Sequence, residues 1–312
     1  MTGASGFVGA NVARRLVADG HDVHLLLRAA SAPWRTRALA GDVRVHGVDL
    51  RDTEGVRAAI VDARPEWVFH LAVHGAYPAQ TDWRQMVETN MLGTMNVVTA
   101  SLDAGAEVIV NTGSSSEYGY KDHAPDEREL VEPNSYYAVT KVGATIFCRY
   151  MAQARGARIP TLRLYSVYGP HEEPTRLVPR LIVNGLAGTL PPLANPDTAR
   201  DFVYVDDVVD AYLAAAERPL ADMGAVLNVG SGVQTKLGEL VEIARRALKI
   251  EAEPHWGSMA ARQWDTSVWV ANIARISAEL DWAPRRALAD GLVATADWLL
   301  ANPDLLAFYR EA

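Results

Sequence analysis

Short apolar runs alternate with stretches of helical periodicity along the first half of the chain. The run at 67–72 is continuously apolar, as expected of a strand that is buried on both faces of a parallel sheet. The segments 10–17, 54–63 and 83–104 carry apolar residues at helical spacing. Further strands are predicted at 22–28, 43–50, 107–112 and 160–165. Strands that alternate with helices in this way predict an α/β fold with a doubly wound parallel sheet.

The pattern changes beyond Gly169 and Pro170, where short apolar segments are broken by glycine and proline. This change predicts a smaller α+β lobe built onto the sheet. We therefore expect a sheet domain at 1–170 and a lobe at 171–312, with some segments of the lobe returning to the sheet.

Composition places the chain among ordinary globular proteins. Its 312 residues are 49% hydrophobic and 22% charged, which allows a full core. No apolar run approaches the roughly 18 to 20 residues of a membrane span, and the N-terminus lacks the basic and apolar regions of a signal peptide. We expect a cytoplasmic protein that does not enter a membrane.

Cysteine, histidine and net charge exclude several kinds of partner. The only cysteine is Cys148, so neither an intramolecular disulfide nor a multi-cysteine metal site can form. The eight histidines show no ligand spacing, and no metal is expected. A net charge of -8 disfavours a nucleic-acid surface but allows a local basic pocket. The expected partner is a small anionic molecule.

A glycine-rich turn opens the chain and leads directly into the first predicted helix. Glycines let the backbone approach a pyrophosphate closely, and the helix N-terminus offers unpaired N–H groups to it. Loop glycines without a ligand are the alternative. The predicted cofactor-binding residues of this turn are Gly3, Ser5, Gly6, Phe7, Val8 and Gly9.

Such a turn should follow a buried strand of ~4 to 6 apolar residues. Only Met1 precedes Thr2 here. We expect that the natural start lies upstream, and that the central sheet lacks its middle strand or borrows a substitute.

Arg28 ends the next predicted strand, where an acidic residue would accept a hydrogen bond from the adenosine ribose. An arginine can instead bind a 2'-phosphate, assisted by Arg35 or Ser31, which favours NADP(H) over the alternative NAD(H). A plain strand-end arginine remains the other interpretation. Asp49 could accept from the adenine amino group, although a turn aspartate is almost as plausible. The remaining predicted cofactor contacts are Leu50, Leu71 and Ala72.

Tyr137 and Lys141 stand four residues apart in a predicted helix, which places both side chains on one face. An ammonium beside a phenol favours the phenolate, so the pair suits proton exchange on an alcohol or a carbonyl. An exposed helical pair is the alternative. Ser114, Ser115 and Ser116 follow a buried strand, at the sheet edge where ligands bind.

In these motifs the chain resembles the extended short-chain dehydrogenase/reductase family, the NAD(P)-dependent nucleotide-sugar epimerases, dehydratases and reductases. The resemblance runs from Thr2 to about Arg285 and implies a Rossmann-type sheet. The segments that carry it are Thr2 to Gly9, His70-Leu-Ala72, Asn90-x-x-Gly93-Thr94, Tyr137-x-x-x-Lys141, Tyr168-Gly-Pro170, Arg200 to Asp207, Asn228 to Gly232 and Leu280 to Pro284.

The resemblance implies roles for the catalytic residues. Tyr137 is the general acid/base, and Lys141 lowers its pKa and holds the nicotinamide ribose. Ser114 bonds the reacting oxygen, with Ser115 as the fallback, and Asn90 supports a water relay. The implied substrate-binding residues are His74, Tyr77, Ser115, Ser116, Ser166, Arg176, Arg200 and Arg262.

Two departures from the family pattern bear on the reaction. Family dehydratases usually carry an Asp-Glu or Ser-Glu pair where Ser115 and Ser116 stand, and Glu117 is one place late, so dehydration is disfavoured. Ser166 replaces an asparagine that is common before Val-Tyr-Gly-Pro, which puts one substrate-phosphate contact in doubt.

The segment from Gly113 to Gly119 is similar to reductases of nucleotide-linked 4-keto-6-deoxyhexoses, enzymes of deoxysugar biosynthesis. With Arg28, it favours an NADPH-dependent 4-ketoreductase. An NAD-dependent 4-epimerase of a nucleotide sugar is the close alternative, and a non-catalytic dinucleotide sensor is the third. Related enzymes dimerise through the helices that carry Asn90 and Tyr137, so a homodimer is expected, with Val142, Ile146 and Phe147 as candidate contacts.

Overall fold

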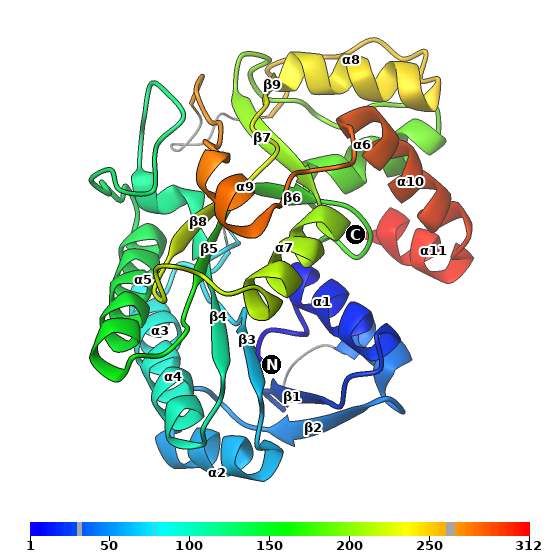
Figure 1. Cartoon of the computed structure of the whole chain (residues 1–312). Helices are drawn as coiled ribbons and strands as arrows, with labels where there is room; N and C mark the ends of the chain where they lie inside the picture. The colour runs from blue at the N-terminus through cyan, green and yellow to red at the C-terminus, as the bar shows by residue number, and fades with distance from the viewer. Residues whose placement is uncertain (30–32, 78, 260–265) are drawn as a thin grey trace.

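The structure is a computed structural model that describes residues 1–29, 33–77, 79–259 and 266–312 (Figure 1). Its strands within these ranges are β1 (Val23–Leu27), β2 (Val43–Gly47), β3 (Trp67–His70), β4 (Val108–Ser114), β5 (Thr161–Leu164), β6 (Ser166–Tyr168), β7 (Ala199–Tyr204), β8 (Val226–Val229) and β9 (Gln234–Lys236). Its helices are α1 (Phe7–Ala18), α2 (Thr53–Ala63), α3 (Trp83–Met86), α4 (Gly93–Asp103), α5 (Tyr136–Arg155), α6 (Leu177–Leu186), α7 (Val205–Glu217), α8 (Leu237–Leu248), α9 (Ala274–Leu280), α10 (Leu288–Leu300) and α11 (Pro303–Glu311).

The central sheet is parallel throughout. Strands β3, β4, β5 and β8 lie side by side in that order, and β1 pairs with β2. Thr2 forms a parallel bridge to Leu26 of β1 and another to His70 of β3. The two groups of strands are therefore linked through a single pairing position in the middle of the sheet.

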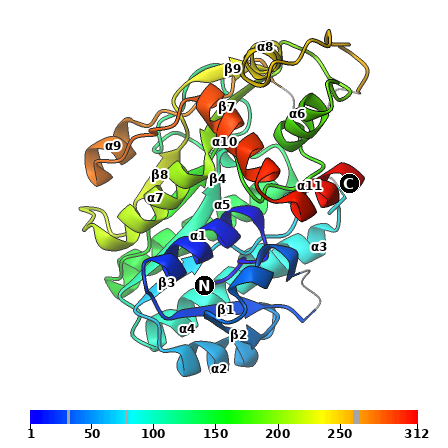
Figure 2. The same ribbon diagram turned by 90° about the vertical axis from the view of Figure 1, so that its right-hand side faces the viewer.

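Helices cover both faces of this sheet, which confirms the predicted doubly wound α/β architecture (Figures 1 and 2). Alternate residues along a strand point to opposite faces. Val108 and Val110 accordingly join one core with α1, α7 and α9. Ile109 lies between them and joins a second core with α2, α4 and α5. Burial on both faces explains why the sequence shows these strands as apolar runs.

The upper part of Figure 1 holds the smaller lobe. Its sheet joins β6, β7 and β9, with β7 antiparallel to β9. Helices α6, α8, α10 and α11 pack around a separate apolar core that includes Leu181, Ile182, Leu240 and Leu292. From the same half of the chain, β8 and α7 return to the central sheet and its covering layer.

The helix predicted at 83–104 is not continuous. A π-helical turn, Val87–Leu92, separates α3 from α4. Such turns insert an extra residue into a helix and are frequent at functional sites. Asn90 lies within this turn and is buried.

No helix in the described ranges combines the length and apolar character that a membrane span needs. Within the same ranges, no cluster of His, Cys, Asp and Glu side chains is arranged to hold a metal ion.

Candidate functional site

The glycine-rich turn packs tightly against the end of β3. Gly3 has a φ of +74°, and a Cβ there would lie 2.5 Å from the backbone N of Ala72. A Cβ on Gly9 would lie 2.2 Å from the carbonyl oxygen of Gly3. Gly6 precedes α1 and makes no side-chain cap. The first-turn N–H groups of α1 thus stay available to a pyrophosphate, and the turn fits a dinucleotide.

A buried hydrogen-bond chain connects this turn to the π-helical turn. Thr94 donates its hydroxyl proton to the Asn90 carbonyl, so its Oγ1 accepts from Nε2 of His70 at 2.9 Å. Nδ1 of His70 then accepts from the Thr2 hydroxyl at 2.8 Å, and Thr2 Oγ1 accepts from the N–H of Ala72. Burial lowers the pKa of His70 to about 3, which keeps the ring neutral in this role.

Asn90 joins the loop after β3 to the helix of Tyr137. Its Oδ1 accepts from the N–H of His74 at 2.8 Å, and its Nδ2 donates to the His74 carbonyl and to Oγ1 of Thr140. Thr140 in turn donates to the carbonyl of Tyr137 at 2.8 Å. Both amide protons of Asn90 are used in this way, so its part in a water relay stays a prediction.

Tyr137 lies at the N-terminal end of α5, near enough to the Ser114 side chain for that hydroxyl to favour the phenolate. Ser114 is the last residue of β4, and its Oγ lies 2.7 Å from Oγ of Ser116. The structure thus brings Ser114 near the tyrosine with Ser116 beside it, whereas Ser115 is buried with only 6% of its surface exposed. Ser114 is the better candidate to bond a reacting oxygen.

Lys141 is buried one turn after Tyr137 and donates from Nζ to the carbonyl of Thr112. Burial lowers the pKa of Lys141, and burial raises the pKa of Tyr137 to about 12. In this structure the ammonium is directed at a backbone carbonyl and loss of solvent dominates at the phenol, so the effect of Lys141 on the pKa of Tyr137 stays a prediction.

Glu117 anchors the segment Ser114–Ser116 through its buried carboxylate, a role that was not predicted from the sequence. Its carboxylate accepts from the N–H of Ser114 at 2.8 Å and forms a buried ion pair with Arg163 at 2.9 Å. The spacing Ser114-x-x-Glu117 is a capping-box signature, and the structure contains that box. This spacing was the available signal.

Arg28 is exposed directly after β1, as its predicted contact with a 2'-phosphate requires. Arg35, however, is buried: it donates to the carbonyl of His171 at 2.8 Å, to the carbonyl of Ser5 at 3.2 Å, and to Glu173 at 3.0 Å. The idea that Arg35 assists at the ribose is therefore wrong, because its guanidinium is already committed. Ser31, the other proposed helper, lies outside the described residues.

Asp49 is also engaged. Both of its carboxylate oxygens accept from the Arg51 side chain, at 3.0 and 2.9 Å, and this arginine holds the pKa of Asp49 below its usual value. An adenine amino group would have to share this acceptor. Leu50 beside it is buried, and Leu71 and Ala72 form the wall against which Gly3 packs.

Predicted substrate contacts fall into two groups. Arg176 donates to the Ala76 carbonyl at 3.2 Å and lies 5.3 Å from the ring centroid of Tyr77, so both stand by the His74 loop. Arg200 lies elsewhere, on β7, 5.8 Å from the ring of Trp269. Ser166 begins β6, opposite Phe202. Arg262 lies outside the described residues.

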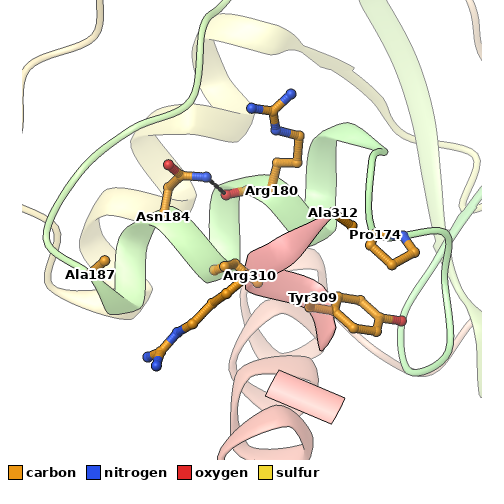
Figure 3. Close-up of a pocket in the computed structure, with 8 residues that line it drawn as sticks. Pro174, Arg180, Asn184, Ala187, Tyr309, Arg310 and Ala312 are labelled. Atoms are coloured by element: carbon orange, nitrogen blue, oxygen red, sulfur yellow. Dashed lines mark hydrogen bonds between the residues drawn. The ribbon is translucent and has the colours of Figure 1, made fainter. Parts of the chain in front are cut away.

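Figure 3 shows a pocket of about 280 Å³ between α6 and α11, lined by Pro174, Arg180, Tyr309 and Arg310 among others. No predicted site residue lines it. A more open hollow of about 520 Å³ is lined by Asp49, Arg51, Asp52, Glu88 and Leu92, at the predicted adenine end of the cofactor site.

Residues 1–230 match the model of the NAD dependent epimerase/dehydratase family. The chain is 31% identical to a UDP-glucose 4-epimerase of Mycolicibacterium smegmatis, over 96% of this chain and 97% of that protein. It is 30% identical to a dTDP-glucose 4,6-dehydratase of Streptomyces griseus, over 96% and 92%. A solved structure of Thermus thermophilus UDP-glucose 4-epimerase in complex with NAD is 27% identical, with a TM-score of 0.84 over 96% of this chain and 98% of that chain.

Proposed function

Since this chain belongs to the NAD dependent epimerase/dehydratase family, within the extended short-chain dehydrogenases/reductases, we propose that it is a nicotinamide-dependent 4-epimerase of a nucleotide-linked sugar. The observation that carries the chemistry is the proximity of the Tyr137 phenol to the Ser114 side chain, one helical turn from Lys141. A phenol beside a second hydroxyl can exchange a proton with a sugar alcohol that contacts both groups.

The residues divide the chemistry at one sugar oxygen. A nicotinamide cofactor held by the glycine turn would supply the hydride acceptor and donor. Ser114 would bond the sugar O4, and Tyr137, as the phenolate, would take the O4 proton while C4 loses a hydride and becomes a ketone. Tyr137 returns that proton when the ketone is reduced from its other face. Lys141 holds α5 against β4 through its hydrogen bond to the Thr112 carbonyl.

Dehydration is disfavoured because Glu117, the only carboxylate in the segment from Gly113 to Gly119, is buried and paired. Elimination of water needs an acid and a base that reach the sugar. Glu117 has no exposed surface and is paired with Arg163, and serines occupy the two preceding positions. The similarity to a dTDP-glucose 4,6-dehydratase thus supports the substrate class more than the reaction.

Arg28 supports a second candidate, an NADPH-dependent 4-ketoreductase of a nucleotide-linked 4-keto-6-deoxyhexose. Arg28 is exposed directly after β1, where the sequence motif predicts a contact with a 2'-phosphate. The sequence alone placed this reductase first. We now place it second, because the Mycolicibacterium relative is named as an epimerase and the Thermus structure holds NAD.

Cofactor analysis combined with product analysis tests these candidates. The purified protein is assayed for bound NAD and incubated with UDP-glucose or dTDP-glucose, and products are separated and identified by NMR. A 4-epimer formed without added cofactor supports the epimerase. In a parallel incubation with a nucleotide-linked 4-keto-6-deoxy sugar, consumption of added NADPH would instead support the reductase and overturn the epimerase. No turnover of any nucleotide sugar would leave a dinucleotide sensor and overturn both.

A further inference from the structure

Glu117 lies where three elements of the site meet. Its Oε1 accepts from the N–H of Ser114 at 2.8 Å and from the Thr145 hydroxyl at 3.1 Å, and its Oε2 accepts from Nε of Arg163 at 2.9 Å. These partners belong to β4, α5 and β5, respectively. One carboxylate therefore fixes the strand end that carries Ser114 against the helix that carries Tyr137.

Thr145 makes this link specific to the catalytic helix face. Tyr137, Lys141 and Thr145 are spaced four residues apart on α5, so they lie along one face. Glu117 bonds the third of these, while Ser114, whose N–H it holds, lies near the first. Any shift of the carboxylate would change the distance between Ser114 and Tyr137.

The carboxylate cannot easily leave this position. Glu117 is fully buried, and Arg163 has 4% of its surface exposed. Arg163 is held in turn over the ring of Tyr118, 4.5 Å from the centroid, and Tyr118 donates to Asn228 at 2.8 Å. A Cβ on Gly113 would lie 2.9 Å from Oε1 of Glu117, so the carboxylate occupies space that a side chain at this position would fill.

We propose that Glu117, paired with Arg163, is a positioning residue for hydride transfer: it sets the Ser114 hydroxyl and the Tyr137 phenol at the distance that one sugar oxygen requires. This inference rests on the proposed function for its activity readout. Its charge acts as well, because the Glu117 carboxylate disfavours the Tyr137 phenolate and favours the Lys141 ammonium. The negative charge of Glu117 therefore acts to raise the pKa of both groups.

A coupling experiment separates positioning from general stability. Glu117→Gln should lower kcat by about tenfold to a hundredfold with a smaller change in KM, since small displacements of reacting groups are costly. In a Ser114→Ala background the same change should have almost no further effect, because the hydroxyl it positions is gone. Equal losses in both backgrounds would overturn the proposal.

Glu127→Gln is the matched control. Glu127 is also buried and also accepts a backbone N–H, that of Asn228, but it contacts neither Ser114 nor α5. Its amide variant should keep kcat. The double variant Glu117→Gln with Arg163→Met removes both charges of the pair and guards against misfolding caused by an unpaired guanidinium. It should fold and show the same loss of kcat as the single variant.

A titration of Tyr137 provides a readout that needs no turnover. In protein labelled with ¹³C at the tyrosine ring, the Tyr137 signal is assigned from its loss in Tyr137→Phe and followed as the pH is raised. Glu117→Gln should lower the pKa of Tyr137, and Glu127→Gln should leave it unchanged. An unchanged titration in Glu117→Gln would exclude the electrostatic part, whether or not a substrate is found. Failure of the wild type on every nucleotide sugar would instead count against the proposed function alone.

Discussion

Nδ2 of Asn90 donates a hydrogen bond of 2.9 Å to Oγ1 of Thr140, which ties the π-helical turn to α5 within one turn of Tyr137. Because Asn90 also bonds both backbone groups of His74, the loop after β3 and the catalytic helix share one buried amide. The positions of the loop that carries Tyr77 and of Tyr137 on α5 thus both depend on the Asn90 side chain.

Asn90→Ala should lose about 2 to 4 kcal/mol of unfolding free energy, because it leaves buried groups of His74 and Thr140 without partners. Urea denaturation measures this loss. Asn96→Ala is the control: among the described residues, the Asn96 side chain on α4 bonds only the Leu50 carbonyl and the Thr53 hydroxyl, so its loss should be near 1 kcal/mol. Equal losses in the two variants would contradict the special role of Asn90.

Tyr137→Phe should lower kcat by about 10²- to 10⁴-fold while leaving cofactor affinity nearly unchanged, since it removes the transferable proton but keeps the ring. Steady-state kinetics and a cofactor titration test this together. Tyr136→Phe is the matched control, because Tyr136 is its neighbour on α5 and is 68% exposed. A Tyr137→Phe variant with more than about a third of the wild-type rate would show that another group is the acid.

If Arg28 makes a charge-assisted bond to the 2'-phosphate, as the reductase candidate requires, NADPH should bind more tightly than NADH by about 10- to 150-fold. Arg28→Asp should reverse the order, and added salt should weaken the preference because Arg28 is exposed. Titration of both cofactors into wild type, Arg28→Asp and the exposed control Arg44→Asp measures this. Equal affinities in the wild type would remove the case for NADPH and with it the reductase.

Ile146 is 57% exposed on α5 and is expected to lie in a homodimer interface with the symmetry-related helix. Ile146→Asp should convert the dimer to a monomer, because a buried unpaired charge is costly at an interface. Light scattering at micromolar concentration tests this. Val61→Asp on α2, at an equally exposed position of 56%, should leave the dimer intact. A monomeric wild type would contradict the prediction.

Acid should destabilise the fold through His70. In the folded state the pKa of His70 is lowered from 6.5 to about 3 by burial, so below pH 6.5 only the unfolded chain takes up the proton. Stability is therefore fully present above pH 6.5 and is lost as the pH falls toward about 3, by as much as about 5 kcal/mol. His70→Asn should flatten this slope in urea titrations at several pH values. The same slope in wild type and variant would contradict the assignment.

The strand and helix pattern was predictable because burial on both faces of a parallel sheet leaves a strong apolar signal, as at 67–72, where β3 forms. The π-helical turn was not, because periodicity over 83–104 does not reveal one inserted residue. The geometry of Ser114 and Tyr137 depends on the register between β4 and α5, which only the folded chain fixes.

Charged residues were the weakest part of the sequence-based interpretation. The sequence does not distinguish the environments of Arg28 and Arg35. In the structure Arg28 is exposed, whereas Arg35 is buried and makes three hydrogen bonds. Glu117 was judged only by its distance from a dehydratase pattern. Its partner Arg163 is far away in sequence, and pairing across that distance follows from the parallel contact between β4 and β5.

Arg35 links the glycine turn to the smaller lobe, so ligand binding at one can affect ligand binding at the other. The same guanidinium binds the Ser5 carbonyl in the glycine turn and the His171 carbonyl and Glu173 at the entrance to the smaller lobe. A dinucleotide that orders the turn would steady those lobe residues before a sugar nucleotide arrives, so the second ligand would meet a smaller entropy loss. Thermodynamic linkage makes the benefit reciprocal: the sugar nucleotide should strengthen binding of the dinucleotide to the same degree. An enzyme that needs its hydride returned within one catalytic cycle gains from holding the carrier most tightly while the ketone is present.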